Sequence, residues 1–257
     1  GVLHYACASG DVATVKLLID HGCNLKAVNH HGDNLLHMTV IHGNDAVLKE
    51  LLKHEDIASQ VDDKNKDKKT AVMLCAEFGS ICMLKSLCAI GAIVGPNLLG
   101  IAAGKGNLPF VKHCMEHLGL KLDHVDGKKR TVLHHACNQG NVEMVRFVLE
   151  NAEGKKDLLM AKDRMGRTAL HVICDSLVSD TAILKLLLDA ANEEGILPEV
   201  IDSKDLFTGN SSLLLVCGRD KGKIHTSNLC MFTVLYFFFR TPSISSRACS
   251  TAQGLPF

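Results

Sequence analysis

Residues 130–150 read RTVLHHACNQGNVEMVRFVLE, and this stretch predicts two short helices joined by a tight turn. Its second half has apolar residues at three- and four-residue spacing, and Gly140 separates the two halves. Helices of two or three turns cannot bury a core alone. The stretch is therefore expected to stack on neighbouring units that are built in the same way.

The same pattern recurs along the chain. Leu-His pairs begin at Leu3, Leu36, Leu133 and Leu170. Leu36 follows Leu3 by 33 residues, and Leu170 follows Leu133 by 37. Weaker copies begin at Thr70, Leu99 and Ser211. A period in this range with a T-x-L-H-x-A core resembles the ankyrin repeat, and the resemblance covers about residues 1 to 218 in six or seven copies.

The resemblance implies an all-α solenoid of paired antiparallel helices joined by hairpin-like finger loops. We expect one repeat domain over residues 1–223. Its repeats lie near 1–28, 29–62, 63–94, 95–123, 124–161 and 162–201, with a partial repeat at 202–223. Residues 224–257 form a divergent, aromatic-rich tail that we expect to lie outside the repeat core. The chain begins inside a repeat without an initiator methionine, so we expect a fragment of a longer protein.

Several repeats depart from the pattern. Glu55 stands where glycine usually closes a second helix, so that helix is expected to fray or run on. The charged run at 61–69 is interpreted as a solvated loop, and the stretch 151–162 as a longer, charged connection. Residues 91–97 are too few for a full finger. Two residues are inserted within 175–180, where glycine would end the first helix of repeat six.

Three interpretations of the tail remain open. Residues 229–239 are apolar except for Thr233, and this run is too short to span a bilayer. The tail is a divergent helix that covers the last repeat, a membrane-surface or partner-binding segment, or foreign sequence from splicing or a gene-model error.

Composition limits the classes of partner. Lys and Arg total 28, as do Asp and Glu, so no global field favours nucleic acid or an anionic membrane. Five of the 11 cysteines, at positions 7, 75, 137, 174 and 217, fall where the repeat needs a small apolar side chain, and no C-x-x-C pair suits zinc. Reduced thiols and the lack of a signal segment indicate a cytoplasmic, intracellular protein.

No motif supports catalysis, and we expect no enzyme activity, no cofactor and no metal. Residues 113–117 read HCMEH, which matches a zinc-protease motif, but they align with the end of a second helix, where neither a third ligand nor a cleft is expected. Phosphate-binding and dinucleotide-binding motifs are absent from the sequence. The recurrent residues of the T-x-L-H core are interpreted as structural: His4, His37, His134, His171, Thr131 and Thr168.

The resemblance places partner contacts at the finger tips and at the ends of the first helices. The finger positions are His30, His31, Asp33, Lys66, Asp67, Lys69, Lys128, Arg130, Arg164, Met165 and Arg167. The helix-end positions are Ile41, His42, Glu77, Phe78, Lys105, Asn138, Gln139 and Asp175.

These features favour a monomeric domain that serves as a scaffold or adaptor and binds another protein. The alternative is the cytoplasmic regulatory arm of a larger ion channel or enzyme. Positive residues on the fingers of repeats five and six suggest an acidic partner segment. Membrane contact is expected only through a larger channel or through residues 229–239.

Overall fold

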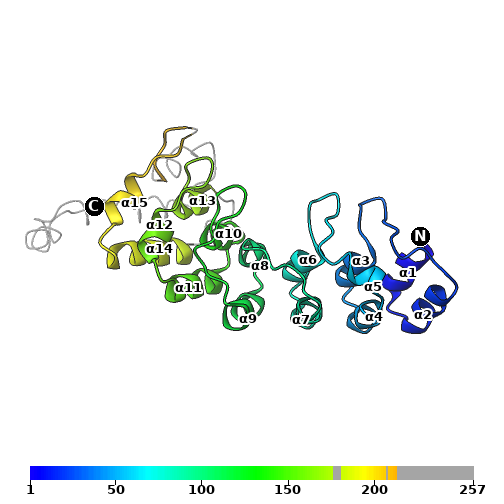
Figure 1. Cartoon of the computed structure of the whole chain (residues 1–257). Helices are drawn as coiled ribbons and strands as arrows, with labels where there is room; N and C mark the ends of the chain where they lie inside the picture. The colour runs from blue at the N-terminus through cyan, green and yellow to red at the C-terminus, as the bar shows by residue number, and fades with distance from the viewer. Residues whose placement is uncertain (176–180, 207, 213–257) are drawn as a thin grey trace, which may run out of the picture. The chain divides into compact units, whose positions relative to one another are not determined.

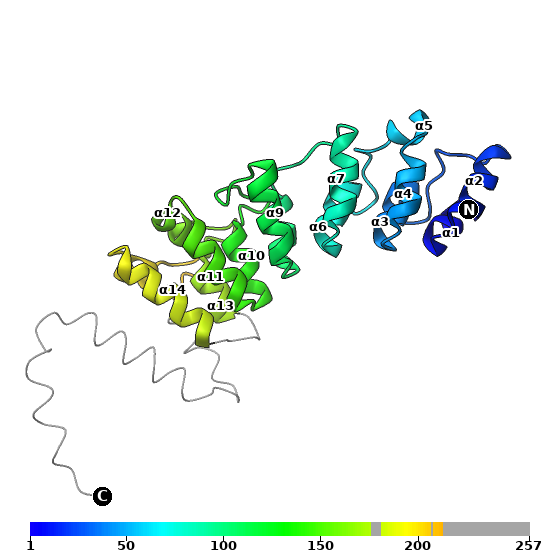
Figure 2. The same cartoon turned by 90° about the horizontal axis from the view of Figure 1, so that it is seen from below.

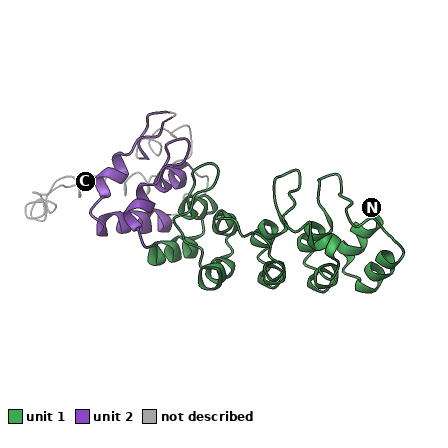
Figure 3. Ribbon diagram, in the orientation of Figure 1, with its two compact units in different colours: residues 1–152 green, residues 153–257 purple. Residues whose placement is uncertain are grey.

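The computed structural model describes residues 1–175, 181–206 and 208–212. The described residues are helical and contain isolated bridges rather than strands. They belong to two compact units, residues 1–152 and 153–257 (Figure 3). The insertion expected within 175–180 and the tail lie almost wholly outside the described residues.

The first unit is a row of antiparallel helix pairs (Figures 1 and 2). The pairs are α1 (Val2–Ser9) with α2 (Val12–Asp20), α3 (Leu35–Ile41) with α4 (Asp45–Leu51), α6 (Ala71–Phe78) with α7 (Ile81–Ala89), α8 (Leu98–Gly104) with α9 (Leu108–Leu118), and α10 (Val132–Gln139) with α11 (Val142–Asn151). The first helices pack in the order α1, α3, α6, α8 and α10. This stacking confirms the all-α repeat fold.

Helix starts and ends follow from local chemistry. The side chains of Thr70 and Thr131 accept hydrogen bonds from the backbone N–H groups of Met73 and His134, which would otherwise lack a partner at a helix start. Gly79 ends α6 in the left-handed conformation, with φ of 77°, which a residue with a Cβ resists. The sequence therefore sets both ends of these first helices.

The core lies between the helix pairs. Phe110 of α9 is among the largest fully buried side chains. In α11, Met144, Val145, Val148 and Leu149 are all buried, as the spacing of the second helix predicts. Burial of apolar surface between neighbouring repeats is thus the main source of stability, because each pair is too small to bury a core by itself.

Short additional helices lie in two of the connections, and the first corrects the expectation at Glu55. The helix of repeat two neither frays nor runs on at Glu55. It ends after Leu51, and the chain then forms α5 (Glu55–Ala58), which buries Ile57. The charged connection at 151–162 contains α12 (Lys155–Met160), whose two leucines are buried.

The second unit contains α12 together with α13 (Ala169–Asp175), α14 (Thr181–Glu193) and α15 (Leu197–Asp202). Helix α14 packs against α12, α13 and α15. The buried side chains of α14 include Ile183, Leu187 and Ala191, spaced four residues apart on one face. The residues described here therefore form their own apolar core.

Histidines join neighbouring repeats at the end of the helices where the fingers emerge, which we call the finger end. His4 Nε2 donates to the carbonyl oxygen of Asp33 at 3.1 Å, and His37 Nε2 donates to that of Lys69 at 2.9 Å. Repeat three has Met73 at this position. The next repeat has no finger to accept such a bond, because only residues 90–97 connect α7 to α8. Repeat three thus lacks the histidine at the same junction where repeat four lacks the finger that would accept its hydrogen bond.

Asparagines join repeats at the opposite end, which we call the turn end. Asn44 Nδ2 donates to the carbonyl oxygen of Cys7 at 2.7 Å, and Asn107 Nδ2 donates to that of Ala76 at 3.1 Å. Ser80 occupies the equivalent place before α7 and makes no such bond. The second and third repeats therefore lack this connection.

The cysteines behave as small apolar side chains. Cys7, Cys75, Cys114, Cys137 and Cys174 are buried. Burial raises the pKa of Cys7 to about 11, which keeps its thiol protonated. Burial agrees with the packing interpretation for Cys7, Cys75, Cys137 and Cys174, while Cys217 lies outside the described residues.

Candidate partner-binding surface

Each finger of the first unit is closed by the side chain of its first residue. Asn29 Oδ1 accepts hydrogen bonds from the backbone N–H groups of His31 and Asp33, both at 2.8 Å. Asn65 makes the equivalent bonds in repeat three. This self-contained loop keeps the backbone satisfied and leaves the side chains at its tip exposed, namely His30, His31, Lys66, Asp67 and Lys128.

Asp33 does not belong with these exposed residues. Its side chain is buried and accepts hydrogen bonds from Asn29 Nδ2 at 3.0 Å and Asn65 Nδ2 at 2.8 Å. The next finger also contacts this one directly, since Lys66 Nζ donates to the carbonyl oxygen of His30 at 2.7 Å. Asp33 therefore joins two fingers, which corrects its assignment as a partner contact.

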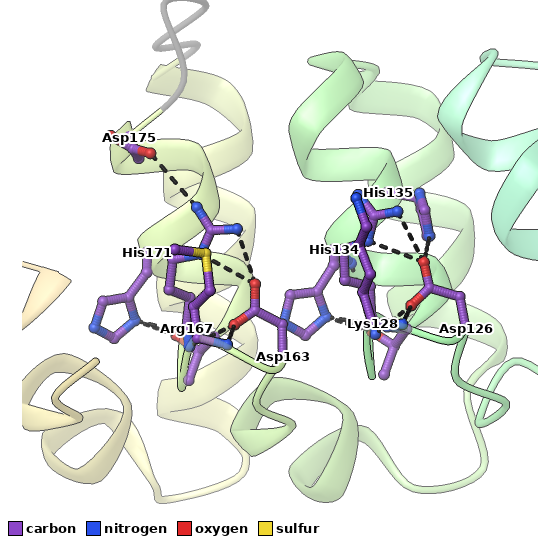
Figure 4. Close-up of polar contacts among 12 residues, drawn as sticks. Asp126, Lys128, His134, His135, Asp163, Arg167, His171 and Asp175 are labelled. Atoms are coloured by element: carbon purple, nitrogen blue, oxygen red, sulfur yellow. Dashed lines mark hydrogen bonds and ion pairs between the residues drawn. The ribbon is translucent and has the colours of Figure 1, made fainter. Parts of the chain in front are cut away.

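Two of the finger arginines, Arg130 and Arg167, are held inside their own repeats, and Figure 4 shows Arg167 between Asp163 and Asp175. In the first unit, Arg130 Nη2 lies 2.8 Å from Asp126 Oδ2. In the second unit, Arg167 pairs with Asp163 at 2.9 Å and with Asp175 at 3.6 Å. Burial opposes ionisation of Asp126, but its hydrogen bonds and the charge of Arg130 outweigh burial and lower its pKa.

These ion pairs alter the expected basic edge. Arg130 and Arg167 are each paired with a carboxylate, whereas Lys128 and Arg164 are exposed. Replacing either paired arginine with glutamate would therefore place two carboxylates together inside a finger and destabilise it. Lys128 and Arg164 are the better positions at which to test charge.

His135 occupies space that a small residue provides. Its ring lies against Gly100 of α8, where a side chain would place its Cβ 3.1 Å from His135 Cδ2. Its Nε2 is 3.1 Å from Asp126 Oδ2 (Figure 4). Burial, followed by the charge of Arg130, lowers the pKa of His135 despite the opposing effect of Asp126.

Acidification is therefore expected to destabilise the fold. His135 takes up a proton near pH 6.5 when unfolded but at a lower pH when folded, so stability is complete above about pH 6.5 and falls as the pH drops below it. His4 and His171 add slopes of the same sign, because burial lowers the pKa of each. Urea titrations at pH 7.0 and 5.5 should show a smaller pH effect for His135→Gln. The exposed His31→Gln is the control and should retain the full effect.

The ends of the first helices present mixed chemistry. Glu77 accepts from Lys69 Nζ at 2.5 Å and from Lys105 Nζ at 2.7 Å, which leaves one net positive charge on this trio. The next residue, Phe78, is 53% exposed. His42, Asn138 and Gln139 are also exposed, while Ile41 is half-buried.

One exposed aromatic residue was missed by the sequence analysis. Tyr5 of α1 is 79% exposed. It stands at the variable position between histidine and alanine in the T-x-L-H-x-A core, which Met38 and His135 occupy in their repeats. The repeat pattern fixes no residue type at that position, and this freedom is the signal that could have identified Tyr5.

The second unit has its own finger. The side chain of Asp163 accepts hydrogen bonds from the backbone N–H groups of Met165 and Arg167, so Arg164 and Met165 lie exposed at the tip. Behind the finger, Thr168 Oγ1 and His171 Nδ1 lie 2.8 Å apart in the buried core. Asp175 is exposed and forms the ion pair with Arg167.

Metal clusters and membrane spans would also bear on function. Across the described parts of the chain, no group of three or more His, Cys, Asp or Glu side chains is arranged to hold a metal ion. None of the helices described here combines the length and apolar character needed to cross a bilayer.

Comparison with protein families identifies the repeat. A family model described as ankyrin repeats (3 copies) matches residues 3–97 and 99–198. The solved structure of the human ASB11 ankyrin repeat domain is similar, with a TM-score of 0.69, 21% sequence identity, and coverage of 90% of this chain and 97% of that one.

Two curated relatives are much longer proteins. The nuclear factor NF-kappa-B p105 subunit of Gallus gallus is 28% identical over 145 residues, which cover 54% of this chain and 15% of that protein. A transient receptor potential cation channel subfamily A member 1 homolog of Caenorhabditis elegans is 26% identical over 159 residues, 60% of this chain and 13% of the channel. The chain thus spans less than a fifth of either relative.

Proposed function

Because this chain belongs to the ankyrin-repeat family, we propose that it is a non-catalytic module that binds another protein through its fingers and the ends of its first helices. The observation that supports this most is Phe78. An aromatic side chain that is 53% exposed beside a capping glycine has no role in the fold, and aromatic residues are enriched where proteins bind each other.

The chemistry around Phe78 suits a partner with both apolar and acidic side chains. The trio of Lys69, Glu77 and Lys105 has a net positive charge, and Lys128 is exposed on a later finger of the same unit. Such charges act on the rate of association more than on final affinity. We propose an acidic partner segment and a monomeric, intracellular domain.

A second role is favoured by the relatives. Since the channel homolog of Caenorhabditis elegans matches over 60% of this chain, the repeats are also suited to act as the regulatory arm of a larger membrane protein. In that role the partner surface would contact another part of the same protein. The full-length reading frame distinguishes the two roles, because a channel adds apolar stretches of about twenty residues.

Replacing Phe78 with alanine is expected to weaken partner binding by about 1 to 2 kcal/mol, or roughly tenfold, with little change in thermal stability. The partner would first be captured with the intact chain and identified, and its affinity then measured by calorimetry. Leu17→Ala is the matched control, because Leu17 is similarly exposed but lies on the second helix of its repeat.

The contribution of charge to binding is tested separately, through the association rate. Lys128→Glu should slow association with the same partner and reduce its dependence on salt. Equal affinity for wild type, Phe78→Ala and Leu17→Ala would contradict the proposed surface. An association rate that ignores both salt and Lys128→Glu would contradict the acidic partner alone.

A further inference from the structure

The H-x-x-E-H sequence of α9 has no part in the proposed function, yet its two histidines lie together. His113 and His117 are separated by one helical turn and share a face of α9. Their ring centroids are 4.2 Å apart, and the ring planes are inclined by 31°. His117 is exposed and His113 is half-buried, so solvent reaches the pair.

The rings have no other polar role within the described residues. Neither imidazole makes a hydrogen bond there, in contrast to His37, which donates to the carbonyl oxygen of Lys69. Cys114, between the two histidines in sequence, is buried in the core together with Phe110 and Val111. The two imidazoles are thus paired, accessible and not required by the fold.

We propose that His113 and His117 chelate a divalent transition-metal ion of the Zn²⁺ or Ni²⁺ type, with water completing its coordination. Two histidines at i and i+4 on one helical face are a known arrangement for holding such ions, and imidazole is a preferred ligand for them. A site with two protein ligands is weaker than the three- and four-ligand sites of zinc enzymes. The inference is therefore of binding and not of catalysis.

Electrostatics around the pair are compatible with a cation. The carboxylate of Glu116 acts on His113 in the direction that favours positive charge, whereas Lys85 of α7 acts in the opposite direction. Lys112, the nearest lysine in sequence, has its ammonium 5.3 Å from the centre of the Phe147 ring.

A bound ion would also affect the helix. It would link two successive turns of α9, and the unfolded chain offers no fixed pair of this kind. Binding to the folded state alone raises stability by mass action. Metal binding and thermal stability should therefore change together in the same variants.

The test uses the full chain, reduced, with Ni²⁺ as the probe, because Ni²⁺ does not oxidise thiols under these conditions. Isothermal titration at pH 7.5 should detect a site that His117→Gln weakens by about 10-fold to 100-fold, the effect of losing a second tethered ligand. His124→Gln is the matched control, since His124 is exposed and lies outside the pair. It should retain the wild-type affinity for this site.

A melting experiment gives the second readout. Saturating Ni²⁺ should raise the melting temperature of wild type and His124→Gln, and it should raise that of His117→Gln much less. Circular dichroism without metal would establish that the variants fold alike. Equal Ni²⁺ affinity in wild type and His117→Gln, or no wild-type binding at millimolar Ni²⁺, would overturn the proposal.

Discussion

Phe110→Ala lowers the free energy of unfolding by about 3 to 5 kcal/mol, which we expect to be the largest effect of any single substitution tested in the first unit. Phe110 is 1% exposed in α9 and packs in the core beside Val111 and Cys114. The loss combines the transfer free energy of the aromatic ring with the cost of the cavity that remains. Urea denaturation followed by circular dichroism measures it.

The chain offers a matched control in Phe78. The same substitution there removes the same atoms from a side chain that is already half in water, so the change should stay within about 0.5 kcal/mol. Comparable losses for the two variants would mean that the assignment of buried and exposed faces in the first unit is incorrect.

His37→Ala should be the second most damaging change, at about 2 to 4 kcal/mol. The ring is buried, its Nδ1 accepts from the backbone N–H of Asn34 at 3.3 Å, and its Nε2 donates to Lys69 across the finger end. Truncation leaves these buried groups without partners and opens a cavity. The loss therefore exceeds that of a single exposed hydrogen bond.

His42→Ala is the control for this position. His42 follows the same helix and is exposed, so its removal should change stability by less than about 0.5 kcal/mol. His37→Gln should recover part of the loss, because its amide can still donate across the finger end. If His37→Ala proved as mild as His42→Ala, the histidine would not join the repeats.

Much of the fold could be predicted from the sequence because its determinants are local and periodic. Thr131 and His134 form the capping box of α10 and Gly140 ends the helix, all within one repeat, so their spacing alone indicates their structure. Helices α5 and α12 could not be predicted in this way. They form because Ile57 and Leu158 find buried sites, and burial depends on neighbours that lie far away in the sequence.

The candidate surface was less predictable for a related reason. The sequence places Asp33 and Arg130 on fingers but does not show which way their side chains turn. Asp33 turns inward to Asn65, and Arg130 turns back to Asp126, because both charged groups gain hydrogen bonds within or between fingers. Phe78 has no such partner and remains exposed, as its position predicts.

The hydrogen bonds between repeats lie at different ends of successive junctions, so the junctions of the first unit should resist bending to different degrees. Repeat three is joined to repeat two at the finger end, through His37 and Lys69, and to repeat four at the turn end, through Asn107 and Ala76. A bend that spreads the fingers therefore strains the junction of repeats two and three but meets little resistance at the next one. A bend that spreads the turn end instead strains the junction of repeats three and four and meets little resistance at the junction of repeats two and three. Each sense of bending therefore strains the hydrogen bonds at one junction of repeat three more than those at the other.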